Sequence, residues 1–366
     1  MKKITAVLLI MALAAIFAVS CQKSDKTLIG IAMPETHVER WVKDGNSLKA
    51  EAEKLGYTGL VQWANADQPT QNQQIQGFLT QGSKALIIGN INDGVGSAVA
   101  DAKREKAIVI AYDRIIQGID DYEYFITFNN YKVGTLQGQS IVAGLGLDSV
   151  TTAKNITLFA GSPTDANANF FFQGAMDVLL PYIESGVLNV VGPFPRHYTD
   201  GAFQQIATEN WMPTIAKARM EALLIGAAQN VTLDAVLAPN DTLARAILEA
   251  CKADAKYQAK LPVTSGQDAE FDSVLSIKNG EQYSTVFKDT AKLAEAAVML
   301  ADQLLKGQNV NIPGTVLAEG DLMEIGATGT GYVNTLLLDP ILITNDNLLI
   351  PVEAGFYGEA QAAQFR

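Results

Sequence analysis

Charged side chains directly follow two apolar stretches of this sequence. Asp113 and Arg114 come after IVIAY, and Arg40 and Trp41 come shortly after LIGIAM. A carboxylate accepts hydrogen bonds and a guanidinium group donates them, and such charge-assisted bonds are strong. We expect Asp113 and Arg114 to form two halves of one clamp on a polar ligand. They would pair poorly with each other, because neighbours in a strand point to opposite faces.

Other apolar stretches end in polar residues of the same kind. These residues are Glu35, Asp165, Asn167, Asn240, Gln267 and Asp268. Every hydroxyl group of a sugar both donates and accepts, so a sugar site needs carboxylate or amide acceptors beside cationic or amide donors. The apolar face of a sugar ring also packs on an aromatic ring, for which Trp41 and Phe171 are candidates. The set as a whole therefore favours a sugar-binding site.

Most of these residues also have a purely structural explanation, which the sequence leaves open. Asp165 and Asn240 are typical N-caps of a following helix. Arg40 could lie on a solvated helix face, and Trp41 could belong to the core. The phenylalanines at 170–172 must divide between core and ligand, because consecutive helical positions cannot all face one site. Capping explains single residues but not the whole set, which carries the prediction.

The elements expected to hold these residues alternate along the chain. Apolar strands are predicted at 28–33, 58–63, 85–88, 108–112, 124–128, 155–160, 187–192, 233–238 and 261–266, with helices at about 69–81, 95–106 and 131–145. Apolar strands separated by amphipathic helices indicate parallel sheets that are covered on both faces. Two such blocks predict an α/β protein with two doubly wound lobes, in which ligands bind beyond the carboxyl ends of the strands.

Composition and motifs argue against several classes of protein. The chain has 366 residues, with 39 acidic and 27 basic side chains and a net charge of −12, which disfavours a nucleic-acid partner. His37, His197 and the two cysteines have no metal-ligand spacing. Phosphate-binding, dinucleotide and nucleophile-elbow motifs are not found, so we expect no metal, no cofactor and no enzymatic activity.

The first residues read as a targeting segment. Two lysines and a short apolar run predict a signal peptide over 1–20. The following AVSC resembles the lipoprotein box of bacteria, so Cys21 is the expected lipidation site at the start of a tether over 21–27. Simple cleavage stays open as the alternative, because Ala18 stands where such boxes usually carry leucine. Lipidation would anchor the protein without a membrane span and leave Cys251 as a lone buried thiol.

Longer motifs resemble a known family. IAMPETHVERWVKDG, VIAYDR, ITFNNYKVGTLQG, FAGSPTDANANFFFQGAM, VLAPND, VTSGQDAE and YSTVFKDT occur in this order. They resemble the exported monosaccharide receptors of ATP-driven importers, especially the xylose-binding and multiple-aldose-binding branch. The resemblance implies a type I periplasmic-binding-protein fold, with two doubly wound lobes joined by a three-crossover hinge. The implied lobes are 28–128 plus 288–335 and 129–287 plus 340–366.

The same resemblance implies a set of sugar contacts. They are Arg40, Trp41, Asp113, Arg114, Asn167, Asn240, Asp268 and Lys288, with Asp165, Glu35 and Trp211 as further candidates. By the resemblance, Arg40 and Trp41 belong to the first loop. Where relatives often have adjacent asparagines after GSP, this chain has Ala166 and Asn167. The segment 196–211 also differs, which leaves the place of Trp211 and the preferred sugar open.

The resemblance also implies a function. We expect an exported monomeric receptor that closes on one free aldose, such as xylose, glucose, galactose or arabinose, and delivers it to the membrane permease of an ABC importer. A chemoreceptor or sensor kinase could read the closed form. The alternative is a receptor on the same fold for a nucleoside or a furanose signalling molecule. Trp41 among many charged groups favours a polyol over a purine base.

Overall fold

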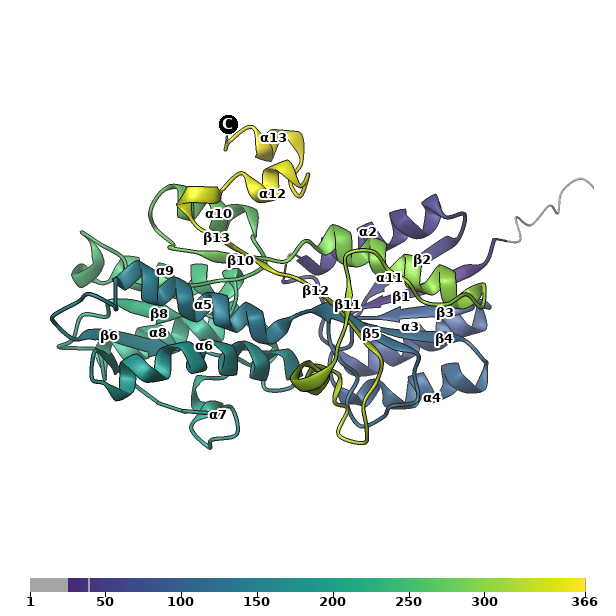
Figure 1. The fold of residues 1–366 in the computed structure, drawn as a ribbon, viewed down its shortest axis with the longest axis horizontal. Helices are drawn as coiled ribbons and strands as arrows, with labels where there is room; N and C mark the ends of the chain where they lie inside the picture. The colour runs from purple at the N-terminus through teal and green to yellow at the C-terminus, as the bar shows by residue number, and fades with distance from the viewer. Residues whose placement is uncertain (1–25, 39, 366) are drawn as a thin grey trace, which may run out of the picture.

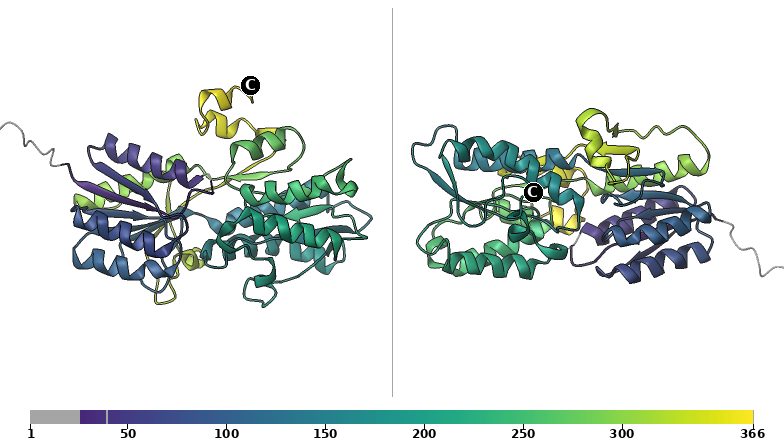
Figure 2. Two further views of the ribbon diagram at one scale, coloured as in Figure 1. Left: turned by 180° about the vertical axis from the view of Figure 1, so that it is seen from behind. Right: turned by 90° about the horizontal axis from the view of Figure 1, so that it is seen from below.

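The computed structural model describes residues 26–38 and 40–365, so the predicted signal peptide and Cys21 lie outside the described residues. The described chain forms two α/β lobes that lie side by side along the long axis (Figures 1 and 2). Within these residues, no helix is both long enough and apolar enough to cross a membrane. The predicted fold class is confirmed.

The first lobe is built on a seven-stranded sheet of order β11-β12-β5-β4-β3-β1-β2. Its strands are β1 (Leu28–Met33), β2 (Thr58–Trp63), β3 (Ala85–Ile88), β4 (Ile108–Tyr112), β5 (Tyr124–Phe128), β11 (Val316–Leu317) and β12 (Thr335–Leu338). All pair in parallel except the edge strand β11, which is antiparallel to β12. The strands predicted from β1 to β5 have the predicted bounds. β1, β3, β4 and β5 are mostly apolar strands inside the sheet, and β2 forms its edge.

Helices cover both faces of this sheet. They are α2 (Arg40–Lys54), α3 (Gln68–Thr80), α4 (Gly96–Arg104) and α11 (Thr290–Leu305), with the 3-10 turns η1 (Asp93–Val95) and η4 (Gly320–Gly326). Leu48 of α2 and Leu293 of α11 pack in one core with Ile31 of β1. Phe78 of α3 and Val99 of α4 pack in a second core on the other face. Two cores on one sheet confirm the doubly wound arrangement (Figure 1).

The second lobe has a four-stranded parallel sheet of order β7-β6-β8-β9. Its strands are β6 (Lys154–Leu158), β7 (Leu188–Val190), β8 (Ala235–Leu237) and β9 (Val263–Thr264). Its helical segments are α5 (Asn130–Leu145), α6 (Ala166–Glu184), α7 (Phe203–Ile206), η2 (Glu209–Trp211), α8 (Pro213–Ile225), α9 (Asp241–Ala253), η3 (Ala255–Tyr257) and α10 (Phe271–Lys278). These strands are shorter than predicted. Apolar residues such as Phe159 and Ala238 stay buried after the strand has ended, so burial extends beyond the hydrogen-bonded ladder.

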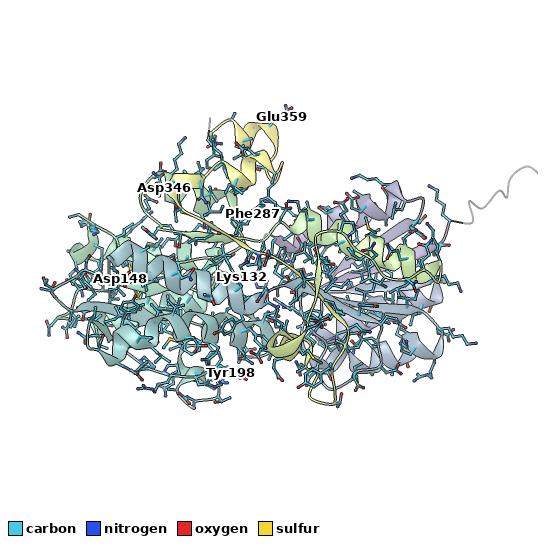
Figure 3. The ribbon with its side chains drawn as sticks, in the orientation of Figure 1. Lys132, Asp148, Tyr198, Phe287, Asp346 and Glu359 are labelled. Atoms are coloured by element: carbon cyan, nitrogen blue, oxygen red, sulfur yellow. The ribbon has the colours of Figure 1, made fainter. Side chains whose placement is uncertain are left out.

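Three links join the lobes. The chain crosses after β5, again between β10 (Thr285–Phe287) and α11, and again between β12 and β13 (Ile341–Ile343). β10 and β13 form a small antiparallel sheet, and the C-terminal segment follows with η5 (Asn345–Asn347), α12 (Ile350–Glu353) and α13 (Glu359–Ala362). Lys132 near the start of α5 pairs with Asp339 in the third link at 2.9 Å; Lys132 is labelled in Figure 3. The start of α5, directly after the first link, is therefore joined to the third link.

The C-terminal segment packs against α10. Phe287 of β10, Ile343 of β13 and Tyr357 share a small core with Val274 of α10. Cys251 of α9 is buried, as predicted, and burial raises the pKa of its thiol to about 12. This thiol is therefore protonated at neutral pH and serves as core packing.

Candidate functional site

One cavity between the lobes collects the polar residues that follow the strands. Its empty space is about 300 Å³. The first lobe contributes Val38, Arg40, Trp41, Asp113 and Arg114, which we call the first wall. The second lobe contributes Asp165, Asn167, Phe171, Trp211, Asn240, Gln267 and Asp268, the second wall, and Lys288 comes from the link after β10. The structure brings all the predicted contacts except Glu35 together at this cavity.

The backbone at Asp113 explains how two consecutive charged residues reach one cavity. Asp113 directly follows β4 and has a left-handed backbone, with φ of 63°. Its N–H still donates to Ile126 at 2.9 Å, so the bend begins at the last position held by the sheet. A left-handed residue breaks the alternation of a strand, and Asp113 and Arg114 both line the cavity. Strained backbone of this kind is typical of functional sites.

Arg40 and Trp41 are the first residues of α2, so their expected place in a loop is corrected. The side chain of Trp41 is only 2% exposed and the residue packs in the core as well as lining the cavity. The guanidinium groups of Arg40 and Arg114 lie 4.7 and 4.9 Å from its ring centre. Trp41 is therefore both a core residue and part of the cavity lining. One edge of a large ring can face a ligand while the rest of the ring is buried.

Asp165 and Asn240 also combine two roles. Asp165 caps α6 by accepting from the N–H of Asn167 at 3.0 Å, and Asn240 caps α9 by accepting from the N–H of Leu243 at 3.0 Å. Both side chains still line the cavity. Helix starts at the carboxyl ends of parallel strands bring capping residues to the ligand edge of a sheet. The capping and binding explanations are therefore compatible.

The three consecutive phenylalanines divide as predicted. Phe171 lines the cavity, whereas Phe172 packs in the core of the second lobe. Phe170 lines a separate hollow of about 1700 Å³ with Leu322 and Ile325 of the first lobe. Only one ring of the three is therefore available to the smaller, more polar cavity.

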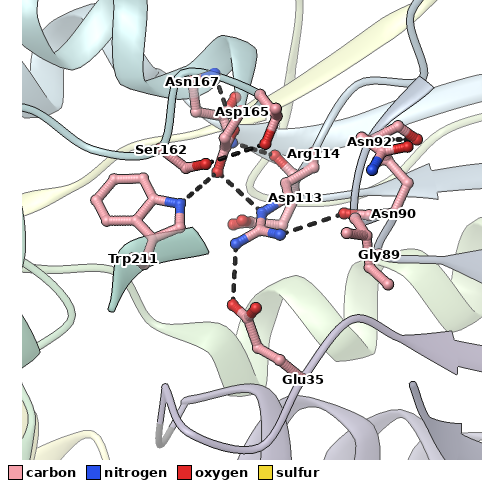
Figure 4. Close-up of polar contacts among 12 residues, drawn as sticks. Glu35, Gly89, Asn90, Asn92, Asp113, Arg114, Ser162, Asp165, Asn167 and Trp211 are labelled. Carbon is pink, nitrogen blue, oxygen red and sulfur yellow. Dashed lines mark hydrogen bonds and ion pairs between the residues drawn. The ribbon is translucent and has the colours of Figure 1, made fainter. Parts of the chain in front are cut away.

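Trp211 is brought to the second wall by an unusual backbone. Asn210 and Trp211 both have left-handed conformations, with φ of 49° and 56°. The indole Nε1 donates to Asp165 Oδ2 at 3.2 Å, as Figure 4 shows. The ring lies so close to the backbone of Gly161 that a Cβ at that position would overlap it. Gly161 and Asp165 together hold this aromatic side chain in place.

Arg114 links the two walls. Its Nε lies 2.9 Å from Asp165 Oδ2 on the second wall, and its Nη2 lies 3.1 Å from Glu35 Oε1. Its Nη1 donates to the carbonyl oxygen of Asn90 at 3.3 Å (Figure 4). Glu35 is 2% exposed and stands behind Arg114, outside the cavity lining. The structure therefore places Glu35 as a positioning residue for the guanidinium group.

Arg40 is held in a similar way. Its Nη2 donates to Asp44 Oδ2 at 2.6 Å, and its Nη1 lies 2.9 Å from Asp113 Oδ2. Lys288 Nζ from the link after β10 lies 2.9 Å from Asp268 Oδ1 of the second wall, and Arg40 Nη1 lies 3.7 Å from the same oxygen. Asp113 thus pairs with Arg40, which comes from another element of the first lobe. Ion pairs within the protein therefore fix the orientation of the carboxylates of Asp44, Asp113 and Asp268.

Burial and charge act differently on the carboxylates. Burial acts to raise the pKa of Asp113, but the nearby positive charges, that of Arg40 first, lower it below the ordinary value. Burial raises the pKa of Asp165, and Arg114 only partly offsets this. Burial also raises the pKa of Asp44 behind Arg40. Asp113 is therefore a firmly ionised acceptor in the site.

The charges of the lining balance. The carboxylates are Asp113, Asp165 and Asp268, and the cations are Arg40, Arg114 and Lys288. A neutral lining of this kind offers many strong donors and acceptors without attracting either sign of charge. Among the described residues, no group of histidine, cysteine, aspartate or glutamate is placed to hold a metal ion. The arrangement suits a small, neutral ligand with several hydroxyl groups.

Three lining residues, Val38, Phe171 and Gln267, are absent from the sugar contacts that the resemblance implies, although Phe171 was named as a candidate for stacking. Val38 precedes α2 and has no sequence signature of a ligand contact. Gln267 directly precedes Asp268 and follows an apolar run, which is a signal that could have placed it in the predicted set. Asn130 is a further buried residue behind the lining, because its Nδ2 donates to Asn167 Oδ1 at 2.7 Å. Asn167 in turn donates to the carbonyl oxygen of Asp113 at 2.7 Å, across the two lobes.

Comparison with known proteins gives a consistent result. Residues 29–309 match the family described as the periplasmic binding protein domain. The chain is 38% identical to the multiple sugar-binding periplasmic receptor ChvE of Rhizobium radiobacter over 94% of each chain. It is 34% identical to the D-xylose-binding periplasmic protein of Escherichia coli (strain K12), over 91% of this chain and 92% of that protein.

Solved structures agree with these relatives. An ABC transporter solute binding protein from Clostridium phytofermentans with bound β-D-glucose is 35% identical and has a TM-score of 0.82, over 92% of this chain and 100% of that chain. A carbohydrate transporter solute binding protein from Chloroflexus aurantiacus in complex with D-glucose is 28% identical and has a TM-score of 0.81, over 92% of this chain and 98% of that chain.

Proposed function

The chain belongs to the periplasmic binding protein family, and from that premise we propose that it is an exported receptor for one free monosaccharide. The ligand class is an aldose such as xylose, glucose, galactose or arabinose. The observation that carries this proposal is the buried, charge-balanced lining of the cavity, with Trp41 on one wall and Trp211 on the other. The likeness to glucose-bound and xylose-binding relatives supports the same ligand class.

The chemistry of the lining explains why a sugar fits. The guanidinium groups of Arg40 and Arg114 can donate to hydroxyl or ring oxygens, and Asp113 and Asp268 can accept from hydroxyl groups. The indole rings offer apolar surfaces for the C–H faces of the sugar ring. A purine nucleoside would leave several of these charged groups without partners, which is costly in a buried site.

The mechanism is closure of the lobes around the sugar. We assign the lobes to 28–128 plus 288–335 and 129–287 plus 340–366, with the three links as the hinge. Polar groups from both walls reach one ligand only when the lobes are close, so the sugar shifts an open–closed equilibrium. Arg114 and Asp165 span the lobes in this structure, and so does a hydrogen bond of 2.9 Å between His37 Nε2 and the carbonyl oxygen of Asn210.

The closed receptor would then deliver its sugar to the permease of an ABC importer. A chemoreceptor or sensor kinase is a second partner that could read the same closed form. Export follows the family, and lipidation at Cys21 would keep the receptor at the membrane surface as a monomer. Mass spectrometry of the purified protein from its host tests the anchor, because a diacylated N-terminal cysteine has a characteristic mass.

Calorimetric titration tests the ligand class. The panel is D-glucose, D-galactose, D-xylose and L-arabinose, with adenosine as the competing ligand class. We expect saturable binding of at least one aldose, tighter than that of adenosine. Absence of binding to every aldose at millimolar concentration would exclude the sugar receptor, and preference for adenosine would favour the nucleoside alternative.

Binding without turnover is the expected outcome. A glycosidase needs one protonated and one ionised carboxyl group at the bond that breaks. Here the lowered pKa of Asp113 keeps it ionised, and Asp165 already accepts from Asn167 and Trp211. Chromatography of the sugar after long incubation should recover it unchanged, and any released product would establish an enzyme.

A further inference from the structure

Gln267 lines the cavity, yet it is outside the predicted set of sugar contacts. It lies on the second wall between β9 and α10, and the residue is only 1% exposed. Burial of an amide is unfavourable unless its donor and acceptor groups find partners. The partners of Gln267 therefore show which end of its amide is available to a ligand.

The protein holds this amide by its nitrogen. Nε2 donates to the carbonyl oxygen of Pro239 at 2.7 Å. Because a carbonyl oxygen can only accept, the oxygen of the amide cannot take that place. Oε1 is buried and has no hydrogen-bond partner among the described residues. Gln267 of the cavity lining therefore has a fixed amide orientation and an acceptor oxygen without a partner among the described residues.

Asn240 is fixed in the opposite sense. Its Oδ1 is committed to the N–H of Leu243 at the start of α9, at 3.0 Å. The capping bond fixes the orientation of this amide and leaves its Nδ2 hydrogens as donors for a ligand. Asn240 directly follows Pro239, whose carbonyl oxygen holds Gln267, so the two amides are neighbours on the second wall. One offers a donor and the other an acceptor, which are the two functions that a hydroxyl group needs.

Building on the sugar-binding function proposed above, we propose that Gln267 is a specificity-determining residue whose Oε1 accepts a hydrogen bond from one hydroxyl group of the sugar. Asp113 and Asp268 are also acceptors, but each has a cation 2.9 Å away. Oε1 of Gln267 is neutral and has no competing donor among the described residues. A sugar without that hydroxyl group leaves a buried acceptor unpaired, and sites built in this way discriminate strongly.

Gln267→Met tests the inference, because methionine is similar in length and lacks the amide acceptor. The carbonyl oxygen of Pro239 keeps a partner in this variant, since Gln137 also donates to it at 3.0 Å. The matched control is Gln205→Met at an exposed position of α7. The probes are the aldose of the four-sugar panel that binds the native protein most tightly and each monodeoxy analogue of that sugar, measured by calorimetric titration.

The expected result is a change in discrimination at one position of the sugar. The native protein should bind one monodeoxy analogue about tenfold more weakly than the parent sugar because of this contact. Gln267→Met should bind the parent sugar about tenfold more weakly and should no longer distinguish it from that analogue. The penalties for the other analogues should persist, and Gln205→Met should behave as the native protein does.

Two results would overturn the proposed role of Gln267 and leave the proposed sugar-binding function intact. One is unchanged binding of the parent sugar by Gln267→Met, and the other is equal weakening for the parent and every analogue, which would indicate a structural role. Circular dichroism checks the fold, and Gln267→Leu with the same analogues takes the place of a variant that does not fold. Absence of aldose binding by the native protein would overturn the proposed function and this inference together.

Discussion

The two walls of the cavity hold their polar groups in different ways. On the first wall, Arg40 and Arg114 are fixed by the buried carboxylates of Asp44 and Glu35. On the second wall, Asp165 and Asn240 accept from backbone N–H groups at the starts of helices, and Asp165 also has an ion pair with Arg114. Charge-assisted bonds are the stronger ones, whereas the cap fixes which end of an amide such as that of Asn240 faces a ligand. We infer that the first wall supplies most of the affinity and the second wall most of the discrimination between sugars.

The largest effect is expected from Asp113→Asn on the first wall. Asparagine keeps the size of the side chain and tolerates a left-handed backbone better than alanine does. The change removes the charge that faces Arg40 at 2.9 Å and takes an ionised acceptor from the ligand. Affinity for the preferred aldose should fall by about 2–5 kcal/mol, which is about thirtyfold or more. Calorimetric titration measures this loss of affinity.

A matched variant controls for the loss of one negative charge. Asp148 is an exposed aspartate of the second lobe, labelled in Figure 3, and Asp148→Asn should leave the affinity unchanged. A loss of less than threefold in Asp113→Asn would contradict the assignment of affinity to the first wall.

Gly161→Ala should have the next largest effect, through the second wall. The added Cβ overlaps the ring of Trp211, which must move. Because no charge changes, the loss of affinity measures the contribution of the Trp211 indole. We expect the affinity to fall by about tenfold. Tryptophan fluorescence should report the displaced ring, and calorimetric titration the affinity.

The control is Gly77→Ala in α3, where a Cβ meets nothing within 4 Å. This variant should bind as the native protein does and should be stabilised by about 0.5–1 kcal/mol. Unchanged affinity in Gly161→Ala, together with an unchanged emission spectrum, would show that Trp211 does not depend on this close approach.

Glu35→Gln should have a smaller effect on the first wall. Glutamine keeps the size of the side chain but removes the charge 3.1 Å from Arg114 Nη2. Arg114 keeps its contacts with Asp165 and Asn90, so its position should loosen without being lost. We expect affinity to fall by less than tenfold for every sugar of the panel alike, whereas the exposed Glu53→Gln should change nothing. A change in the ranking of the sugars would contradict a positioning role.

The smallest effect concerns pH and separates the two walls. Burial raises the pKa of Asp165, so this residue takes up a proton above the ordinary value of about 3.9. Its contribution to affinity is present above the raised pKa and is lost as the pH falls through it. Asp113 has a lowered pKa and stays ionised there. Affinity should therefore decrease a few-fold as the pH falls from 7 toward 4.

Asp165→Asn tests the source of this pH dependence. Asparagine keeps the cap of α6 but cannot titrate, so the variant should bind more weakly at pH 7 and show a flatter profile. Burial also raises the pKa of Asp44 behind the first wall. If the affinity of Asp165→Asn depended on pH as steeply as that of the native protein, the pH dependence would be assigned to Asp44.

Strand bounds were predicted correctly where the buried apolar run and the hydrogen-bonded ladder end at the same residue. The strands β1, β3, β4 and β5 lie inside the large sheet, and their apolar runs end where the ladder ends. In the second lobe, the run that contains β6 continues through Phe159 and Ala160, which are buried although the strand ends at Leu158. An apolar pattern reports removal from water, and it does not report which backbone groups pair.

Site prediction followed the same logic. Polar residues that follow a strand, such as Asp113 and Asn240, were predicted as ligand contacts because parallel strands point their carboxyl ends at one edge, and both line the cavity. Trp211 could not be placed from the sequence, because its position depends on the left-handed backbone that it shares with Asn210. Gln267 was named among the polar residues that follow the strands, but the resemblance did not include it in the sugar contacts. Only its bond to Pro239 shows which end of its amide lacks a partner among the described residues.

The double role of the capping residues constrains how this receptor could change its ligand. Asp165 and Asn240 each hold the start of a helix while they line the cavity, so many substitutions there would lower folding stability by about 1 kcal/mol as well as altering binding. Gln267 and Phe171 cap no helix. Adaptation or redesign toward a new sugar is therefore expected to proceed through such positions first, because a substitution there leaves more of the stability margin intact.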